Sequence, residues 1–133
     1  MEAAPAAAIF RIGVLPTAMA GLLNELNELA RHEHADLIAL TRASGIVYAA
    51  ILAKEGDSNG PAALTGSVKR VFDACGKSEI SASAMLEFCP AEVKLAVGGV
   101  WGASRKDFEL MQRVKHSFDP HGVLSPGRFA GGI

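Results

Sequence analysis

Apolar residues recur along this chain in two rhythms, which divide it into short elements. Apolar positions three and four residues apart predict helices at 18–32 and 61–75. Alternating or continuous apolar runs predict strands at 9–15, 37–43, 46–54 and 80–88. In the last of these, the alternation places Ala84, Leu86 and Phe88 on the same side. The order is β-α-β-β-α-β, which predicts an α+β, ferredoxin-like fold. Such a fold has a four-stranded antiparallel sheet with two helices on one face.

Turn-forming residues support these boundaries. Thr17 is a suitable N-cap for the first helix, and Ser44-Gly45 is typical of a hairpin turn. Pro61 is placed for the first turn of the second helix, and Gly76 for its C-terminal stop. The residues that cap helices and form turns therefore fall between the predicted helices and strands.

The segment 46–53 is apolar on both of its faces. A central strand of this kind is normally covered on both sides. Two helices on one face would leave the other face of the sheet exposed, so we expect that face to meet a partner or to support a homo-oligomer.

The last thirty residues differ from the rest. Gly98-Gly99 breaks regular structure, Trp101 follows, and Ser104 with Asp107 has the spacing of a capping box. A helix with one apolar face is expected next, built on Phe108, Leu110, Met111, Val114 and Phe118. Pro120 should end it, and Gly122 and Pro126-Gly127 predict a turn-rich tail. We therefore divide the chain into a flexible linker at 1–8, a ferredoxin-like domain at 9–103 and a C-terminal helix with its tail at 104–133.

Composition narrows the classes of function. The 133 residues are half hydrophobic with a formal net charge of −1, which gives no basic surface for nucleic acid. The sequence contains no run of about 18 apolar residues, so it predicts no membrane span. The alanine-rich start lacks the features of a signal peptide. A linker there suggests that another segment precedes the domain. Cys75 and Cys89 are expected to be reduced, buried thiols.

The residues alone give no complete catalytic set. His32, His34 and Asp36 have poor spacing for a metal, and no nucleophile elbow, Walker A or G-x-G-x-x-G motif occurs. His121 faces either solvent or a ligand. Trp101 is either a core residue or lies at the edge of a ligand. Arg128 is either a solvated charge or the partner of a phosphate or carboxylate. The chain is therefore expected to contribute to a site built elsewhere.

The tail resembles a known family. From Trp101-Gly102 through Phe118-Asp119-Pro120-x-Gly122-x-Leu124-x-Pro126-Gly127-Arg128 it is similar to the C-terminal end of FAD-linked oxidases of the vanillyl-alcohol oxidase type. Within them it most resembles the FAD-binding chain of glycolate oxidase. Its finish, Gly-Arg-Phe-Ala-Gly-Gly-Ile at 127–133, has the same form. Ser125 stands where that family usually has Asn.

This resemblance implies the cap, or substrate-side, domain of an FAD-dependent 2-hydroxy-acid oxidoreductase. FAD would be bound mostly by a domain absent from this chain, so the chain alone would be inactive. No metal and no catalytic acid or base is implied. The positions implied on the cofactor side or at the interface are Trp101, Gly102, Asp119, Ser125, Pro126, Gly127 and Arg128.

The resemblance also implies partners and a location. The partners would be a flavin-binding domain, other oxidase subunits and a small 2-hydroxy acid. The location would be cytoplasmic, peripheral at the inner membrane through partner subunits. The alternative interpretation is a free-standing ferredoxin-like binding or oligomerisation module without catalytic activity. In that interpretation the exposed sheet face would bind a ligand or a second copy.

Overall fold

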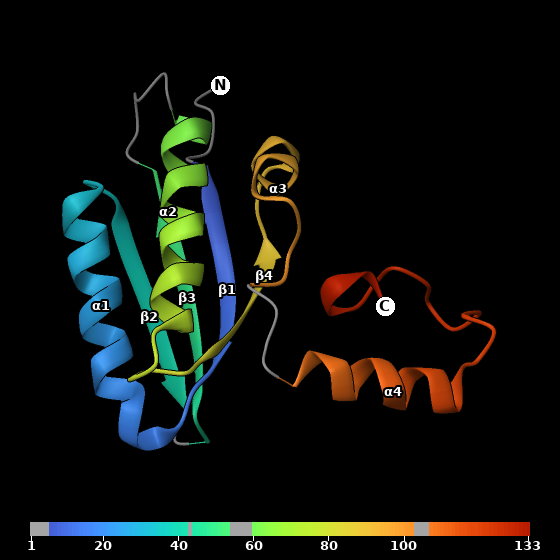
Figure 1. The fold of residues 1–133 in the computed structure, drawn as a ribbon. Coiled ribbons are helices and arrows are strands. Elements are labelled where there is room, and N and C mark those ends of the chain that lie inside the picture. The colour runs from blue at the N-terminus through green and yellow to red at the C-terminus, as the bar shows by residue number, and fades with distance from the viewer. Residues whose placement is uncertain (1–5, 43, 54–59, 103–106) are drawn as a thin grey trace. The chain divides into compact units, whose positions relative to one another are not determined.

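The computed structural model describes residues 6–42, 44–53, 60–102 and 107–133, and it divides the chain into two compact units (Figure 1). The first unit spans residues 1–102 and the second spans residues 103–133. Most of the linker predicted at 1–8 lies outside the described residues, but Ala7 and Ala8 belong to the first strand. That strand therefore begins two residues earlier than the sequence pattern indicates.

The first unit has the predicted mixed order of strands and helices (Figure 1). The four strands form one antiparallel sheet in the order β2-β3-β1-β4, which confirms the α+β, ferredoxin-like fold. Its elements are β1 (Ala7–Gly13), a 3₁₀ turn η1 (Pro16–Ala18), α1 (Met19–His32), β2 (Asp36–Arg42), β3 (Ile46–Leu52), α2 (Gly60–Gly76), β4 (Ser83–Phe88) and α3 (Ala91–Val97).

One face of the sheet carries the core. Alternate residues of β1, β3 and β4 point toward the helices, and the apolar stripes of α1 and α2 pack against them. Phe10 and Phe72 meet edge to face, with ring centroids 5.7 Å apart. Val93 of α3 is fully buried in the same cluster. The remaining fully buried large side chains are Ile12, Leu22, Leu26, Ile51, Leu64, Val47, Val68 and Val71.

The turn between β2 and β3 has a steric requirement. Gly45 has φ +81°, and its carbonyl accepts a hydrogen bond of 2.8 Å from the Val14 amide. A Cβ atom at this position would lie 2.4 Å from the Val14 carbonyl oxygen. The Ser44-Gly45 turn signal therefore coincides with a close approach of the backbone, which only glycine permits.

The opposite face of the sheet is open, and several of its exposed side chains are apolar. Ile38 and Leu40 of β2 are 62% and 59% exposed. Phe88 is 59% exposed, although its alternation with Ala84 and Leu86 indicated a position on the same side. That expectation is wrong, because the β1–β4 register shifts between Ile9 and Phe10 and pairs Phe88 with Ile9.

The two edges of the sheet differ. Beside β4, the Leu86 amide donates to the Val100 carbonyl at 2.7 Å, and Met85 and Trp101 form an isolated antiparallel bridge. This segment follows α3, whose C-cap is Gly98 with φ +86°. In the part of the chain that the structure describes, β2 has a neighbouring strand on one side alone.

The second unit contains α4 (Phe108–Phe118) and a short turn η2 (Ala130–Gly132). The predicted capping box placed the helix start near Ser104, which lies outside the described residues. Asp107 instead occupies the N-cap position of α4. At its C-terminal end the chain returns toward the start of α4. Gly131 lies so close to the Phe108 ring that an added Cβ atom would clash with it.

Candidate functional site

Two of the predicted site residues belong to the first unit, beside β4. Trp101 is half-buried and pairs with Met85 across the sheet edge. The Gly102 amide lies 3.4 Å from the Ala84 carbonyl that accepts its hydrogen bond. A Cβ at Gly102 would lie 3.0 Å from the Phe72 ring, so packing against Phe72 gives a structural reason for glycine at this position.

The other predicted residues belong to the second unit, where Asp119 directly follows α4 and the segment 125–128 lies further along the tail. Asp119 Oδ1 accepts a hydrogen bond from the Val123 amide, and Oδ2 accepts one from the Leu124 amide, both at 2.9 Å. Lys115 Nζ lies 2.5 Å from Oδ2. One carboxylate therefore organises the turn through two amides and one ammonium group.

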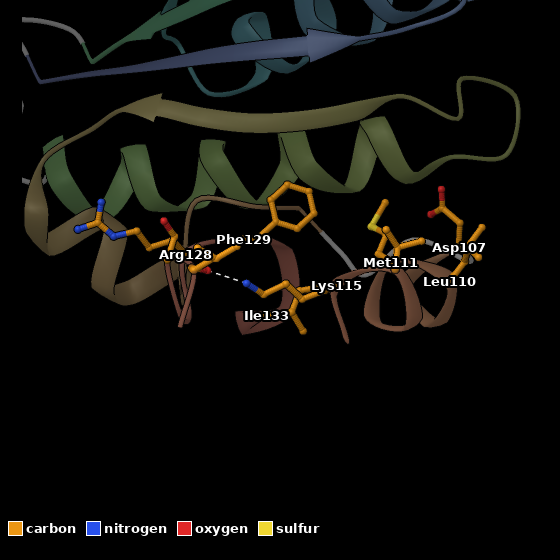
Figure 2. Close-up of a pocket in the computed structure, with 10 residues that line it drawn as sticks. Asp107, Leu110, Met111, Lys115, Arg128, Phe129 and Ile133 are labelled. Carbon is orange, nitrogen blue, oxygen red and sulfur yellow. Dashed lines mark hydrogen bonds between the residues drawn. The ribbon is translucent and has the colours of Figure 1, made fainter. Parts of the chain in front are cut away.

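We call the group formed by Lys115, Asp119, Val123 and Leu124 the clamp. Lys115 makes a second contact within it. Its Nζ also donates to the Leu124 carbonyl at 2.6 Å (dashed line in Figure 2). The lysine thus bonds both the side chain and the backbone of the turn. The sequence did hold a signal for this contact, since Lys115 and Asp119 are four residues apart across the helix end.

The clamp changes the acidity of Asp119. Asp119 as a whole is only 6% exposed, and the hydrogen bond from Lys115 lowers the pKa of its carboxyl to about 2, with help from the Leu124 and Val123 amides. Both carboxylate oxygens are occupied within the tail, so the described contacts of Asp119 are structural. Its predicted contact with a cofactor stays a prediction.

Beyond the clamp, the turn at 125–128 is tightly bent and exposed. Ser125 and Gly127 have φ values of +48° and +71°, and the Arg128 amide donates to the Ser125 carbonyl at 3.3 Å. A non-glycine residue in this backbone conformation is uncommon. The Ser125–Arg128 segment therefore has a defined backbone shape. The side chains of Ser125 and Arg128 are accessible from solvent.

A cavity of about 530 Å³ lies between α4 and the returning tail (Figure 2). Its walls are mostly apolar, and its polar groups come from Asp107, Lys115, Ser125 and Arg128. The volume is in the range of small-molecule sites. The apolar lining residues are Leu110, Met111, Val114, Leu124, Phe129 and Ile133.

The structure brings only some predicted residues together. Ser125 and Arg128 share the cavity wall, and Asp119 holds the turn that leads to them. His121 is exposed and does not line this cavity, and His116 is exposed on α4. Sequence reasoning missed Lys115 and the cavity itself, which depends on how the tail returns over α4.

The cysteines differ from each other. Cys75 is buried, and burial raises the pKa of its thiol to about 12, so the expected buried, reduced thiol is present there. Cys89 is also a free thiol but only half-buried, which corrects the expectation of burial.

Within the described residues, no three His, Cys, Asp or Glu side chains are grouped to hold a metal ion. None of the described helices is long and apolar enough to cross a membrane.

Comparison with known proteins identifies the same segment. A family model for the C-terminal domain of FAD linked oxidases matches residues 101–129. The matched part begins at Trp101, beside β4, and contains α4, the clamp and the Ser125–Arg128 turn. The match supports a C-terminal domain of an FAD-linked oxidase and associates this segment with flavoproteins in general. Neither the curated proteins nor the solved structures gave a match to this chain.

Proposed function

We propose that this chain is the cap, substrate-side domain of an FAD-dependent 2-hydroxy-acid oxidoreductase of the glycolate oxidase type. Most of the FAD site would belong to another domain. The single observation that carries the proposal is the match over residues 101–129 to the C-terminal domain of FAD linked oxidases. The clamp supports it, because it gives this matched segment a fixed shape without a hydrophobic core.

The residues of the tail fit the edge of a flavin better than a whole dinucleotide. Ser125 offers a hydroxyl and Arg128 a guanidinium, which suit carbonyl or anionic groups at the border of an apolar cavity. Asp119 carries a negative charge that is already neutralised by Lys115. FAD, when bound, would accept a hydride from the α-carbon of the hydroxy acid. The chain's own part is to orient, to exclude water and to close the site from one side.

The substrate, partners and location belong to the same proposal. A small 2-hydroxy acid would be the substrate, and a flavin-binding domain with further oxidase subunits would be the partners. The enzyme would be cytoplasmic, and it would lie at the inner membrane only through those subunits. This chain alone would be inactive, because the domain that binds most of the FAD would lie outside it.

The first test uses the isolated chain and FAD. We expect no flavin absorbance to stay with the protein after gel filtration of the mixture, because the dinucleotide site lies elsewhere. A tightly bound, visibly yellow chain would contradict the proposal. Free riboflavin in a parallel sample controls for weak stacking of the isoalloxazine ring on exposed aromatic side chains.

The second test adds the flavin-binding domain that the proposal requires, expressed as a separate polypeptide. We expect the pair to form a complex that reduces a dye acceptor with glycolate or lactate, while either component alone does not. Arg128→Ala should weaken the complex, whereas Arg113→Ala on the exposed surface of α4 serves as the matched control. Normal oxidase activity without this chain would overturn the proposal.

A second candidate function rests on the exposed sheet face. Ile38, Leu40 and Phe88 together expose an apolar surface of the kind found at binding sites. In this alternative the chain is a free-standing binding or oligomerisation module. It predicts that the chain neither binds the flavin polypeptide nor changes its activity, so the same mixing experiment separates the two functions.

A further inference from the structure

Strand β2 forms an open edge of the sheet (Figure 1). The opposite edge, at β4, is partly covered by the bonds to Val100 and Gly102, whereas β2 pairs with β3 alone among the described strands. Six of the seven residues of β2 are exposed, and Leu37 is the half-buried exception. An edge of this kind presents unpaired backbone N–H and C=O groups to any strand that can add to it.

The usual protections of an edge strand are missing from β2. Its sequence, Asp-Leu-Ile-Ala-Leu-Thr-Arg, has no proline and no lysine. Its register with β3 runs without interruption from Asp36 to Arg42, in contrast to the shifted register between β1 and β4. Natural proteins normally interrupt such an edge with a bulge, a proline or a central charge. In β2 the charges stand only at the two ends.

The sequence of β2 is complementary to itself about its centre, Ala39. In an antiparallel pair of two β2 strands related by a twofold axis at Ala39, Asp36 lies opposite the partner's Arg42. Ile38 lies opposite the partner's Leu40, and both side chains are more than half exposed in the single chain. The pairing therefore joins opposite charges at both ends and apolar side chains at the centre.

We propose that two copies of this chain associate through β2, antiparallel about a twofold axis at Ala39, into one sheet with four strands from each copy. A second copy fits better than an unrelated strand, because the two ends of β2 supply each other's countercharge. Asp36 and Arg42 are about 20 Å apart along their own strand, so they cannot pair within one chain. Neither forms an ion pair within the described part of the chain.

This association is independent of the proposed function. Edge pairing uses the backbone of β2 and involves no residue of the Ser125–Arg128 turn. An isologous contact of this kind closes after two copies, so it predicts a dimer rather than a filament. Its failure would leave the flavin experiments untouched, and their failure would leave the dimer untouched.

The first experiment reverses the end charges and measures the dimer by sedimentation equilibrium of the full chain. Asp36→Arg and Arg42→Asp should each raise the Kd of the dimer about tenfold, because one reversal alters two symmetry-related pairs. The double variant, Asp36→Arg with Arg42→Asp, should restore the original affinity. Glu109→Arg on α4 controls for the change in net charge, and circular dichroism confirms that each variant is folded.

The second experiment tests the register with single cysteines. At the twofold axis the two Cα atoms of residue 39 would be about 4.5 or 5.5 Å apart, within the range of a disulfide. Ala39→Cys should therefore form a covalent dimer under mild oxidation. Thr41→Cys is the matched control, since its two copies would lie about 13 Å apart. Both variants carry Cys89→Ser, and Cys75 is buried.

The possible results separate clearly. A dimer that both charge reversals weaken, that the double variant restores and that Ala39→Cys cross-links supports the proposal. A monomer at the highest attainable concentration overturns it, and leaves the β2 edge for a strand from another protein. A dimer that is insensitive to the reversals and is not cross-linked at position 39 also overturns it, and indicates association through the open sheet face.

Discussion

The two units of this chain are ordered by different forces. In residues 1–102, side chains from three strands and three helices are buried in one apolar cluster. In the described part of residues 103–133, Asp119 is the one buried residue, and α4 has none. The first unit is therefore held by the burial of apolar surface, and the second by hydrogen bonds that converge on a carboxylate.

This difference bears on the proposed docking of the tail. A unit with its own core can fold before it meets a partner. The tail instead keeps large apolar side chains exposed, among them Phe118 at 83% and Val123 at 72%. A defined backbone with an apolar surface is typical of a segment that gains its burial on docking. The contrast therefore agrees with a tail that docks on a second domain.

Two leucine variants should show the contrast at its largest. Leu26→Ala in α1 removes a fully buried side chain and should lower the free energy of unfolding by about 2–5 kcal/mol. Leu110→Ala in α4 removes a side chain that is 58% exposed, so its effect should stay within about 0.5 kcal/mol. Urea unfolding followed by circular dichroism measures both. Equal losses would mean that α4 shares the core.

A pair of glycine variants should give the next largest effect. Gly45→Ala should cost about 2–3 kcal/mol, because the new Cβ adds a clash with the Val14 carbonyl to the strain of a positive φ. Gly98→Ala has a similar φ of +86° but no atom within 4 Å, and should cost about 1 kcal/mol. Thermal unfolding of both variants under the same conditions tests the difference, and an equal cost would show that the turn relaxes.

Asp119→Asn should loosen the tail and leave the first unit unchanged. The amide side chain has one acceptor oxygen and no charge, so it cannot hold both the Val123 and Leu124 amides and Lys115. Hydrogen exchange at these two amides should become on the order of tenfold faster. Glu109→Gln, on the same helix, is the matched control. Unchanged exchange in Asp119→Asn would mean that the clamp does not order the turn.

Low pH should also loosen the tail, because it protonates the Asp119 carboxylate, and the loosening should stay small until the pH approaches 2. The pKa of Asp119 is lowered from 3.8 to about 2 by its bonds to Lys115 and the two amides. Its stabilising contribution is therefore fully present above about pH 4 and is lost as the pH falls through about 2. The amide shifts of Val123 and Leu124, followed by NMR, should titrate with a midpoint near 2. A midpoint near 4 would contradict the clamp.

Much of the first unit could be predicted from the sequence, because its helices and strands follow local apolar periodicity. The alternation in β1 and β3 and the apolar stripes of α1 and α2 identify their buried faces directly. Phe88 was misplaced because a register shift depends on how two strands pair, which alternation within one strand does not contain. The start of β1 was missed because small alanines carry little strand preference.

Less of the candidate site could be predicted. The turns at Gly122 and Pro126-Gly127 were visible, as was the unusual composition of the tail. The role of Asp119 as the centre of the clamp was not, because it depends on amides that approach only after the chain turns. The role of Gly102 depends likewise on Phe72, a residue of α2 that is distant in the sequence.

The central claim is that the tail docks this chain on a flavin-binding domain. Calorimetric titration with a separately expressed flavin-binding domain of the proposed kind tests it most directly, with the full chain and a version ending at Gly102 compared side by side. Circular dichroism first confirms that the shortened version keeps its fold. The account predicts that the full chain binds and that the shortened chain binds at least about a hundredfold more weakly. Equal binding by the two would contradict it.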